Sequence, residues 1–93
     1  MARNNKRQYN VVYLCYNEQR DDLETLGTPI EFGTDCRAAI KRAKEISFDD
    51  FTPQGQTFQL AAVECYTETE MTTYQPLYLD CYLNGVRVGR VNQ

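Results

Sequence analysis

Histidine and tryptophan are absent from the 93-residue chain, and proline occurs only three times. Histidine is the commonest general base and the usual activator of a serine or cysteine nucleophile, so its absence argues against both kinds of catalysis. It also excludes a mixed Cys/His zinc site. A glycine-rich phosphate loop, a nucleophile elbow and a metalloprotease motif are missing as well. The sequence therefore predicts a protein that is not an enzyme and that carries no cofactor or metal.

A secretory signal and a long apolar run are also missing. The first ten residues, MARNNKRQYN, are polar and basic, and no apolar segment of membrane-spanning length follows them. The four cysteines are separated by 21, 29 and 16 positions, which matches no metal-binding motif. We therefore expect a cytoplasmic protein that does not contact a membrane and whose cysteines are reduced.

Charge is distributed unevenly along the chain, whose formal net charge is −3. Residues 18–80 contain thirteen acidic and five basic side chains, a net charge of −8, and the other five basic residues lie near the two ends. The acidic balance does not favour direct binding of nucleic acid. An acidic middle suits a protein partner with a basic surface, such as a complex that handles nucleic acid.

Residues 34–47, TDCRAAIKRAKEIS, form the one convincing helix pattern. Thr34 or Asp35 is a suitable N-cap. The apolar stripe is composed mostly of small side chains, which predicts close packing against a sheet. Its members are Cys36, Ala39, Ile40, Ala43 and Ile46. Arg37, Lys41 and Lys44 lie beside the stripe, either as a solvated face or as an alternative binding surface for an acidic partner.

The remaining apolar segments have the composition of β-strands. Residues 9–16 are apolar in both phases, which is typical of a central strand. Residues 25–32 contain Pro29, which predicts a short edge strand. In residues 57–67 the apolar phase shifts, and this predicts a bulge near Ala61. In the loop before that strand, we expect Phe48 and Phe51 to cover one end of the core.

Residues 73–83 show the clearest alternation, and Asn84-Gly85 then predicts a type I′ hairpin to a last strand at 86–91. We expect the odd-numbered residues Leu77 to Leu83 to face the core, together with Val86 and Val88. The resulting fold class is α+β. It consists of a single twisted antiparallel sheet of about five strands with one helix packed on one face, in the order ββαβββ. Residues 1–93 form one domain, with 1–7 as a flexible basic arm.

Two surfaces are candidates for binding a partner. The first is the face of the sheet expected to point away from the core, where tyrosine and arginine residues suit an interface. Its members are Tyr78, Asp80, Tyr82 and Arg87. The second consists of acidic loops, which we expect to meet a basic partner. These loops contain Asp21, Asp22, Glu68 and Glu70. We expect a monomer or a homodimer.

A short, acidic, cysteine-containing chain with one helix on a small antiparallel sheet resembles the small phage-encoded inhibitors of bacterial defence, the anti-CRISPR and anti-restriction proteins. The resemblance covers the architecture of nearly the whole chain and includes no motif. It implies a stoichiometric inhibitor that blocks the nucleic-acid-binding or assembly surface of a CRISPR or restriction complex. The alternative is a small nucleic-acid-binding or regulatory module, in which aromatic residues of a sheet face stack on bases and the basic termini meet phosphates.

Overall fold

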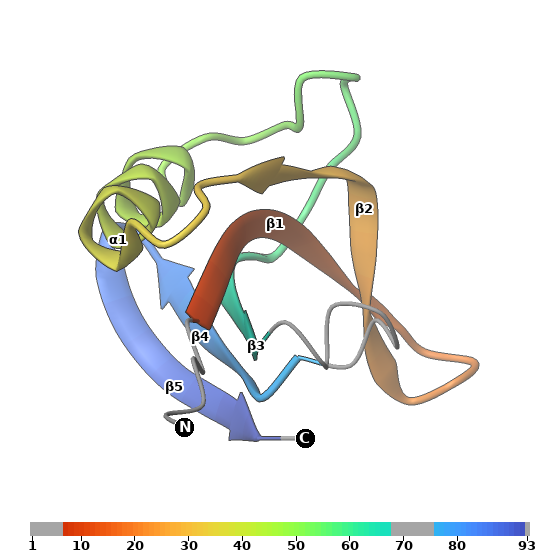
Figure 1. Ribbon diagram of the computed structural model, residues 1–93. Coiled ribbons are helices and arrows are strands. Elements are labelled where there is room, and N and C mark those ends of the chain that lie inside the picture. Colours follow the sequence, from red (N-terminus) through yellow and green to blue (C-terminus); the bar gives the residue numbers. More distant parts are fainter. Residues whose placement is uncertain (1–6, 68–75, 93) are drawn as a thin grey trace, which may run out of the picture.

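Five antiparallel strands and one helix make up the fold, as the computed structural model describes it for residues 7–67 and 76–92 (Figure 1). The predicted α+β class and the ββαβββ order are confirmed. The strands lie in the order β2-β1-β3-β4-β5 across one sheet. The elements are β1 (Arg7–Asn17), β2 (Asp22–Glu31), α1 (Cys36–Ile46), β3 (Leu60–Thr67), β4 (Tyr78–Leu83) and β5 (Val86–Asn92). The predicted basic arm lies outside the described residues, except for Arg7, which begins β1.

The helix begins and ends close to where the sequence predicted. Asp35 is the N-cap, and its carboxylate accepts a hydrogen bond of 3.0 Å from the backbone N–H of Ala38. This bond satisfies one of the free donors in the first turn. Ala39, Ala43 and Ile46 are buried against the sheet, so the small-residue stripe packs as expected.

β1 is an interior strand, as its two apolar phases indicated. It pairs with β2 on one side and with β3 on the other. Val11 and Tyr13 belong to the core between sheet and helix, whereas Val12 and Leu14 belong to a second core on the opposite face. The sheet therefore buries apolar side chains on both faces, although only one face carries a helix.

β2 is an edge strand, but it is ten residues long rather than short. The pairing with β1 passes from Val11↔Ile30 to Tyr13↔Leu26, so three residues of β2 oppose one of β1. Gly27 lies within this irregularity and has φ +71°, a conformation that glycine adopts without strain. β2 bends sharply along its length (Figure 1), so Pro29 coincides with a bend instead of ending the strand.

The bulge predicted near Ala61 is wrong. Residues 60–67 of β3 pair with β1 without a break, and the irregularities lie between Val11 and Tyr13 and between Cys81 and Tyr82. β3 is apolar in both phases because both of its faces are covered, as in other buried strands. The strand begins at Leu60, three residues later than expected.

The predicted orientation of β4 is inverted. Tyr82 is only 2% exposed and packs in the helix-side core, whereas Cys81 is buried and Leu79 half-buried on the opposite face. The small side chains of the helix explain this orientation of β4. They leave space between helix and sheet, and the ring of Tyr82 fills that space. β4 starts at Tyr78, and residues 73–75 of the predicted strand lie outside the described residues.

Phe48 and Phe51 do not cover the core, since they are 65% and 56% exposed. Phe58 takes that place instead. Its ring packs edge-on against Tyr13, with ring centroids 4.8 Å apart and planes at 76°. This contact closes the helix-side core and leaves the two earlier phenylalanines at the surface.

We expect Ile46→Ala to lower the free energy of unfolding by roughly 2–5 kcal/mol, because it opens a cavity between α1 and the sheet. Val86→Ala, a matched truncation of an exposed side chain, should change it by about 0.5 kcal/mol or less. Urea denaturation followed by circular dichroism measures both. Equal losses in the two variants would contradict the packing described for α1.

Candidate functional site

The predicted surface row of β4 and β5 lies on the same face of the sheet as α1. Tyr82 is buried among helix residues, and Asp80 lies directly opposite Val63 of the helix-side core. Because its ring is buried, Tyr82 cannot stack on a nucleic-acid base in this fold. Asp80 and Arg87 of the predicted row do not form an open binding surface. They belong to an ionic network at the edge of the helix-side core.

Asp80 is the centre of that network. Arg90 donates from Nε to Oδ1 of Asp80 at 2.8 Å and from Nη2 to Oδ2 at 3.2 Å. Nη2 of Arg87 lies 3.1 Å from Oδ1. The guanidinium of Arg90 also stacks on the ring of Tyr78, 3.8 Å from its centroid. This network fixes β5 against β4 and holds both arginine side chains in place.

The electrostatic effect on Asp80 follows from these contacts. Burial alone would raise the pKa of Asp80, but the hydrogen bonds and charge of Arg90, together with the charge of Arg87, outweigh it and hold the pKa below its ordinary value. Burial also raises the pKa of Tyr78 and of Tyr82, so both phenols are neutral at physiological pH.

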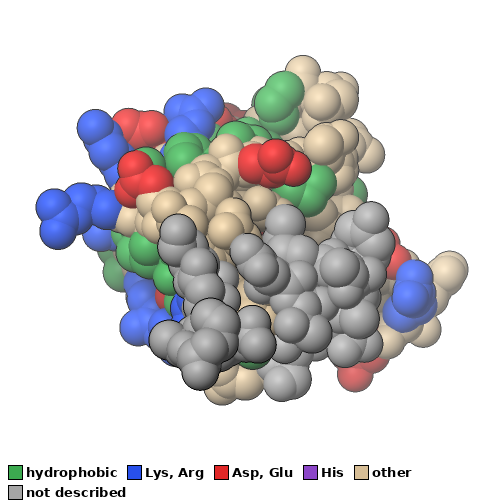
Figure 2. All heavy atoms as spheres, viewed as in Figure 1, with side chains coloured by type: hydrophobic (Ala, Val, Ile, Leu, Met, Phe, Trp, Pro, Cys, Tyr) green, Lys and Arg blue, Asp and Glu red, His purple; other side chains and the backbone are tan. Residues whose placement is uncertain are grey.

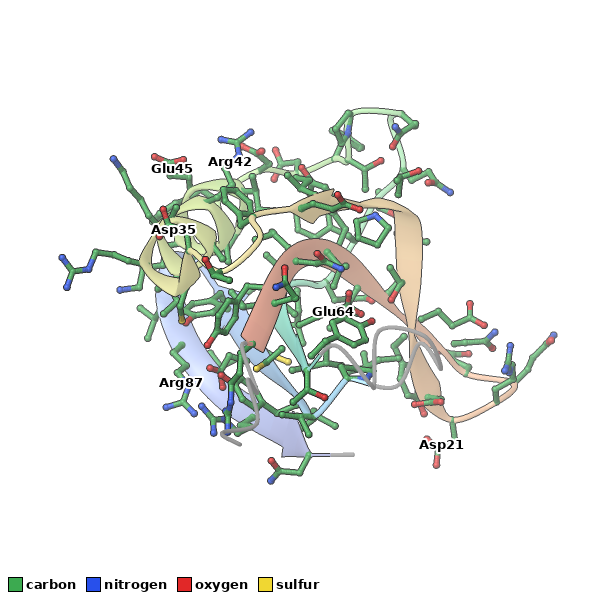
Figure 3. All side chains as sticks on the ribbon, viewed as in Figure 1. Asp21, Asp35, Arg42, Glu45, Glu64 and Arg87 are labelled. Carbon is green, nitrogen blue, oxygen red and sulfur yellow. The ribbon has the colours of Figure 1, made fainter. Side chains whose placement is uncertain are left out.

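The acidic loop candidates lie elsewhere. Asp21 and Asp22 are exposed where β1 turns into β2, and Figure 3 shows Asp21 on the opposite side of the molecule from Arg87. Tyr16 donates a hydrogen bond from its hydroxyl to Asp21. Glu68 and Glu70 lie outside the described residues. The predicted β4–β5 row and this acidic turn therefore do not form one continuous surface.

The basic residues of the helix remain exposed. Arg37, Lys41 and Lys44 point to solvent, and none of the ion pairs among the described residues includes them. Arg42 is paired with Glu45 at 3.2 Å. Figure 2 shows most of the visible Lys and Arg side chains on the side of the molecule formed by α1 and β5, although the opposite side also carries basic atoms.

Apolar residues of β5 are exposed, and the sequence prediction missed this. Val86 and Val88 are 61% and 54% exposed instead of facing the core. The reason is that β5 is the edge of the sheet and nothing covers it among the residues described. The available signal was that Arg87, Gly89 and Arg90 interrupt the apolar residues of β5, since charged side chains are common on edge strands.

The turn of the β4–β5 hairpin is hydrogen-bonded to the C-terminal end of α1. Asn84 and Gly85 have φ angles of 51° and 80°, as the predicted type I′ turn requires. The backbone N–H of Gly85 donates to Oγ of Ser47, the C-cap of α1, at 2.7 Å. The Phe48 ring lies where a Cβ at position 85 would be, only 2.4 Å from it. We call the surface composed of Arg37, Lys41, Lys44, Phe48, Val86 and Val88 the α1–β5 surface.

Neither a metal cluster nor a membrane-spanning helix is found in the described part of the chain. Among residues 7–67 and 76–92, no group of three or more His, Cys, Asp or Glu side chains is arranged to hold a metal ion. In the same residues, no helix is long and apolar enough to cross a membrane. Comparisons of the chain with protein-family models, curated proteins and solved structures gave no match.

We expect Asp80→Asn to lower the free energy of unfolding at pH 7 by about 1–3 kcal/mol, because charge-assisted hydrogen bonds to two arginines are lost. Since the pKa of Asp80 is lower in the folded than in the unfolded protein, this contribution is present above the unfolded value near pH 4. It is lost as the pH falls through the folded pKa. Urea titrations of both proteins from pH 7 to pH 2 measure the difference.

Asp50→Asn is the control, because Asp50 is exposed and makes no ion pair with any described residue. It should leave the stability unchanged across the same range. A stability of Asp80→Asn equal to that of the parent protein at pH 7 would show that the network does not stabilise the fold.

Proposed function

We propose that the chain is a small non-catalytic protein-binding module, an inhibitor or adaptor, and that it binds an acidic extended segment of a partner protein along β5. The observation that carries the proposal is the combination of an edge strand bearing exposed valines with unpaired cations on the adjacent helix.

The backbone of β5 supports this mode of binding. It hydrogen-bonds to β4 on one side, and its other side meets no strand among the described residues. An edge strand of this kind is a template to which an extended peptide can add as a further strand. Backbone hydrogen bonds would supply affinity, and contacts with Val86 and Val88 would supply selectivity for apolar positions in the segment.

Charge indicates the nature of the partner. The helix carries four basic residues and one acidic residue, a net charge of +3, and β5 adds Arg87 and Arg90, whose shared partner Asp80 offsets one of their two charges. An acidic segment complements this surface and is guided to it electrostatically. A second copy of the chain, paired through β5 about a two-fold axis, would bring the same cations together, and this disfavours self-association at this edge.

The resemblance to phage-encoded inhibitors of bacterial defence is a narrower form of the same proposal. An inhibitor of that kind would occupy an assembly surface of a CRISPR or restriction complex. The α1–β5 surface favours an acidic protein segment over a basic channel for nucleic acid. Docking of the acidic turn on a basic partner is the second candidate, and its support is the exposure of Asp21 and Asp22.

A pair of designed peptides tests the choice between these surfaces. One alternates valine with glutamate and the other valine with lysine, so they share length and strand propensity and differ in charge. We expect the acidic peptide to shift the backbone amide resonances of β5 in ¹H–¹⁵N NMR spectra and the basic peptide to leave them in place. Shifts confined to the β1–β2 turn with the basic peptide would overturn the proposal in favour of the acidic turn.

Two helix substitutions test the electrostatic part. Lys41→Ala combined with Lys44→Ala should weaken binding of the acidic peptide by up to about tenfold and reduce its dependence on salt. Arg20→Ala, which removes an exposed cation from the β1–β2 turn, is the matched control and should have no effect. Isothermal titration calorimetry at two salt concentrations measures both. Equal losses in the two proteins would argue against a specific basic surface.

A further inference from the structure

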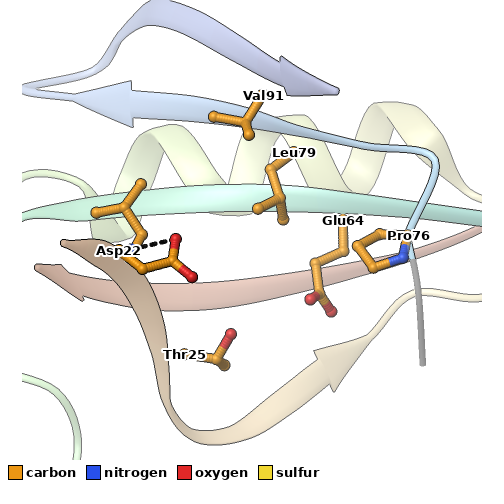
Figure 4. Close-up of a pocket in the computed structure, with 7 residues that line it drawn as sticks. Asp22, Thr25, Glu64, Pro76, Leu79 and Val91 are labelled. Carbon is orange, nitrogen blue, oxygen red and sulfur yellow. Dashed lines mark hydrogen bonds between the residues drawn. The ribbon is translucent and has the colours of Figure 1, made fainter. Parts of the chain in front are cut away.

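The face of the sheet opposite α1 is hollowed by a pocket of about 300 Å³ (Figure 4). Its polar lining consists of Asp22, Thr25 and Glu64, and its apolar walls include Leu23, Leu79 and Val91. The bend in β2 brings Leu23 and Thr25 to the same pocket as Glu64 of β3. This volume is at the lower end of the range for small-molecule sites.

Glu64 is the unusual residue of the pocket. It lies between Asn10 and Leu79 in the sheet and is only 7% exposed. Oε1 of its carboxyl is fully buried and has no hydrogen-bond partner among the described residues. Burial raises the pKa of Glu64, and hydrogen bonds from Tyr66 and Asn10 oppose this effect only in part. A buried carboxyl oxygen without a partner is costly, and a water molecule, an ion or another ligand is a usual explanation for it.

The side chains that line the pocket indicate which chemical groups a ligand would need. The two carboxylates are not accompanied by any Lys or Arg among the lining residues, and each can accept hydrogen bonds. The hydroxyl of Thr25 is a third acceptor. An ammonium group is a cation with three N–H donors, which suits a lining of carboxylates without a basic residue, and the walls formed by Leu79 and Val91 suit an alkyl chain attached to it. The pocket is much larger than a bare metal ion.

From this geometry we propose that the pocket binds an alkylammonium group, with the carboxylate of Glu64 as its principal acceptor. Two sources carry this chemistry, a free alkylamine and a lysine side chain of another protein. The pocket shares no residue with the α1–β5 surface, but Val91 of β5 lines it, so the amides of Glu64 and Leu79 distinguish binding in the pocket from binding along β5.

Titration with n-butylammonium at pH 8, followed by ¹H–¹⁵N NMR, tests the proposal. We expect saturable shifts of the amides of Glu64, Leu79 and Val91. n-Butanol has the same alkyl chain without the charge and should give none. Equal shifts with butanol, or no saturable shifts with millimolar butylammonium, would overturn the proposal. So would tighter binding of Mg²⁺ or Ca²⁺ at the same residues.

Glu64→Gln tests the role of the carboxylate while keeping the size of the side chain. It should weaken butylammonium binding by about tenfold or more, the effect of losing a hydrogen bond to a charged group. The same spectra show whether the variant is folded. Asp50→Asn removes a carboxylate that does not line the pocket and should bind as the parent protein does. Unchanged affinity in Glu64→Gln would overturn the proposal.

A lysine-containing pentapeptide, Gly-Gly-Lys-Gly-Gly, distinguishes the two sources. Tighter binding of this peptide than of butylammonium, lost in Glu64→Gln, would support the proposal with a protein lysine as the ligand. Tighter binding of butylammonium, also lost in Glu64→Gln, would support it with a free amine as the ligand.

Discussion

The close approach of α1 to the sheet is the contact on which the rest of the structure depends. Ala39 and Ala43 are fully buried there and place no long side chain between helix and strands. Tyr82 fills the space beside them, and its position determines which face of β4 points toward the helix-side core. Asp80, two residues away on the same face, is thereby removed from water and requires partners. Arg87 and Arg90 supply them, so the course of β5 follows from the small side chains of the helix.

The two buried carboxylates of the sheet show how environment decides the behaviour of one chemical group. Asp80 has two guanidinium partners, and its pKa is lowered. Glu64, on the other face, has only neutral hydrogen-bond donors, and its pKa is raised. A lone buried carboxylate costs folding free energy, whereas a paired one need not. A small domain has little stability to spare, so the unpaired position is the more informative of the two about function.

The sequence predicted those parts of the fold that local chemistry determines. An N-cap at Thr34 or Asp35, the spacing of Ala39 and Ala43, and the Asn84-Gly85 turn were each predicted from local sequence, and the structure confirms them with Asp35 as the cap. The orientation of β4 was wrong because leucine and tyrosine both suit a buried face, and only the size of the helix residues decides between them. The pocket around Glu64 could not be foreseen, because the bend in β2 brings together residues whose spacing carries no signal.

The strand order also has a consequence for how the chain reaches its folded state. β1 is an interior strand, yet its partner β3 lies between 46 residues (Leu14↔Leu60) and 60 residues (Arg7↔Thr67) further along the chain. The β1–β2 hairpin can form early from local contacts, but pairings across such separations form slowly. Until β3 arrives, one edge of a strand containing Val11, Val12 and Leu14 stays open, and such edges attract other unpaired strands. A chain interrupted before residue 60 keeps that edge open permanently and becomes a substrate for chaperones or a nucleus for aggregation.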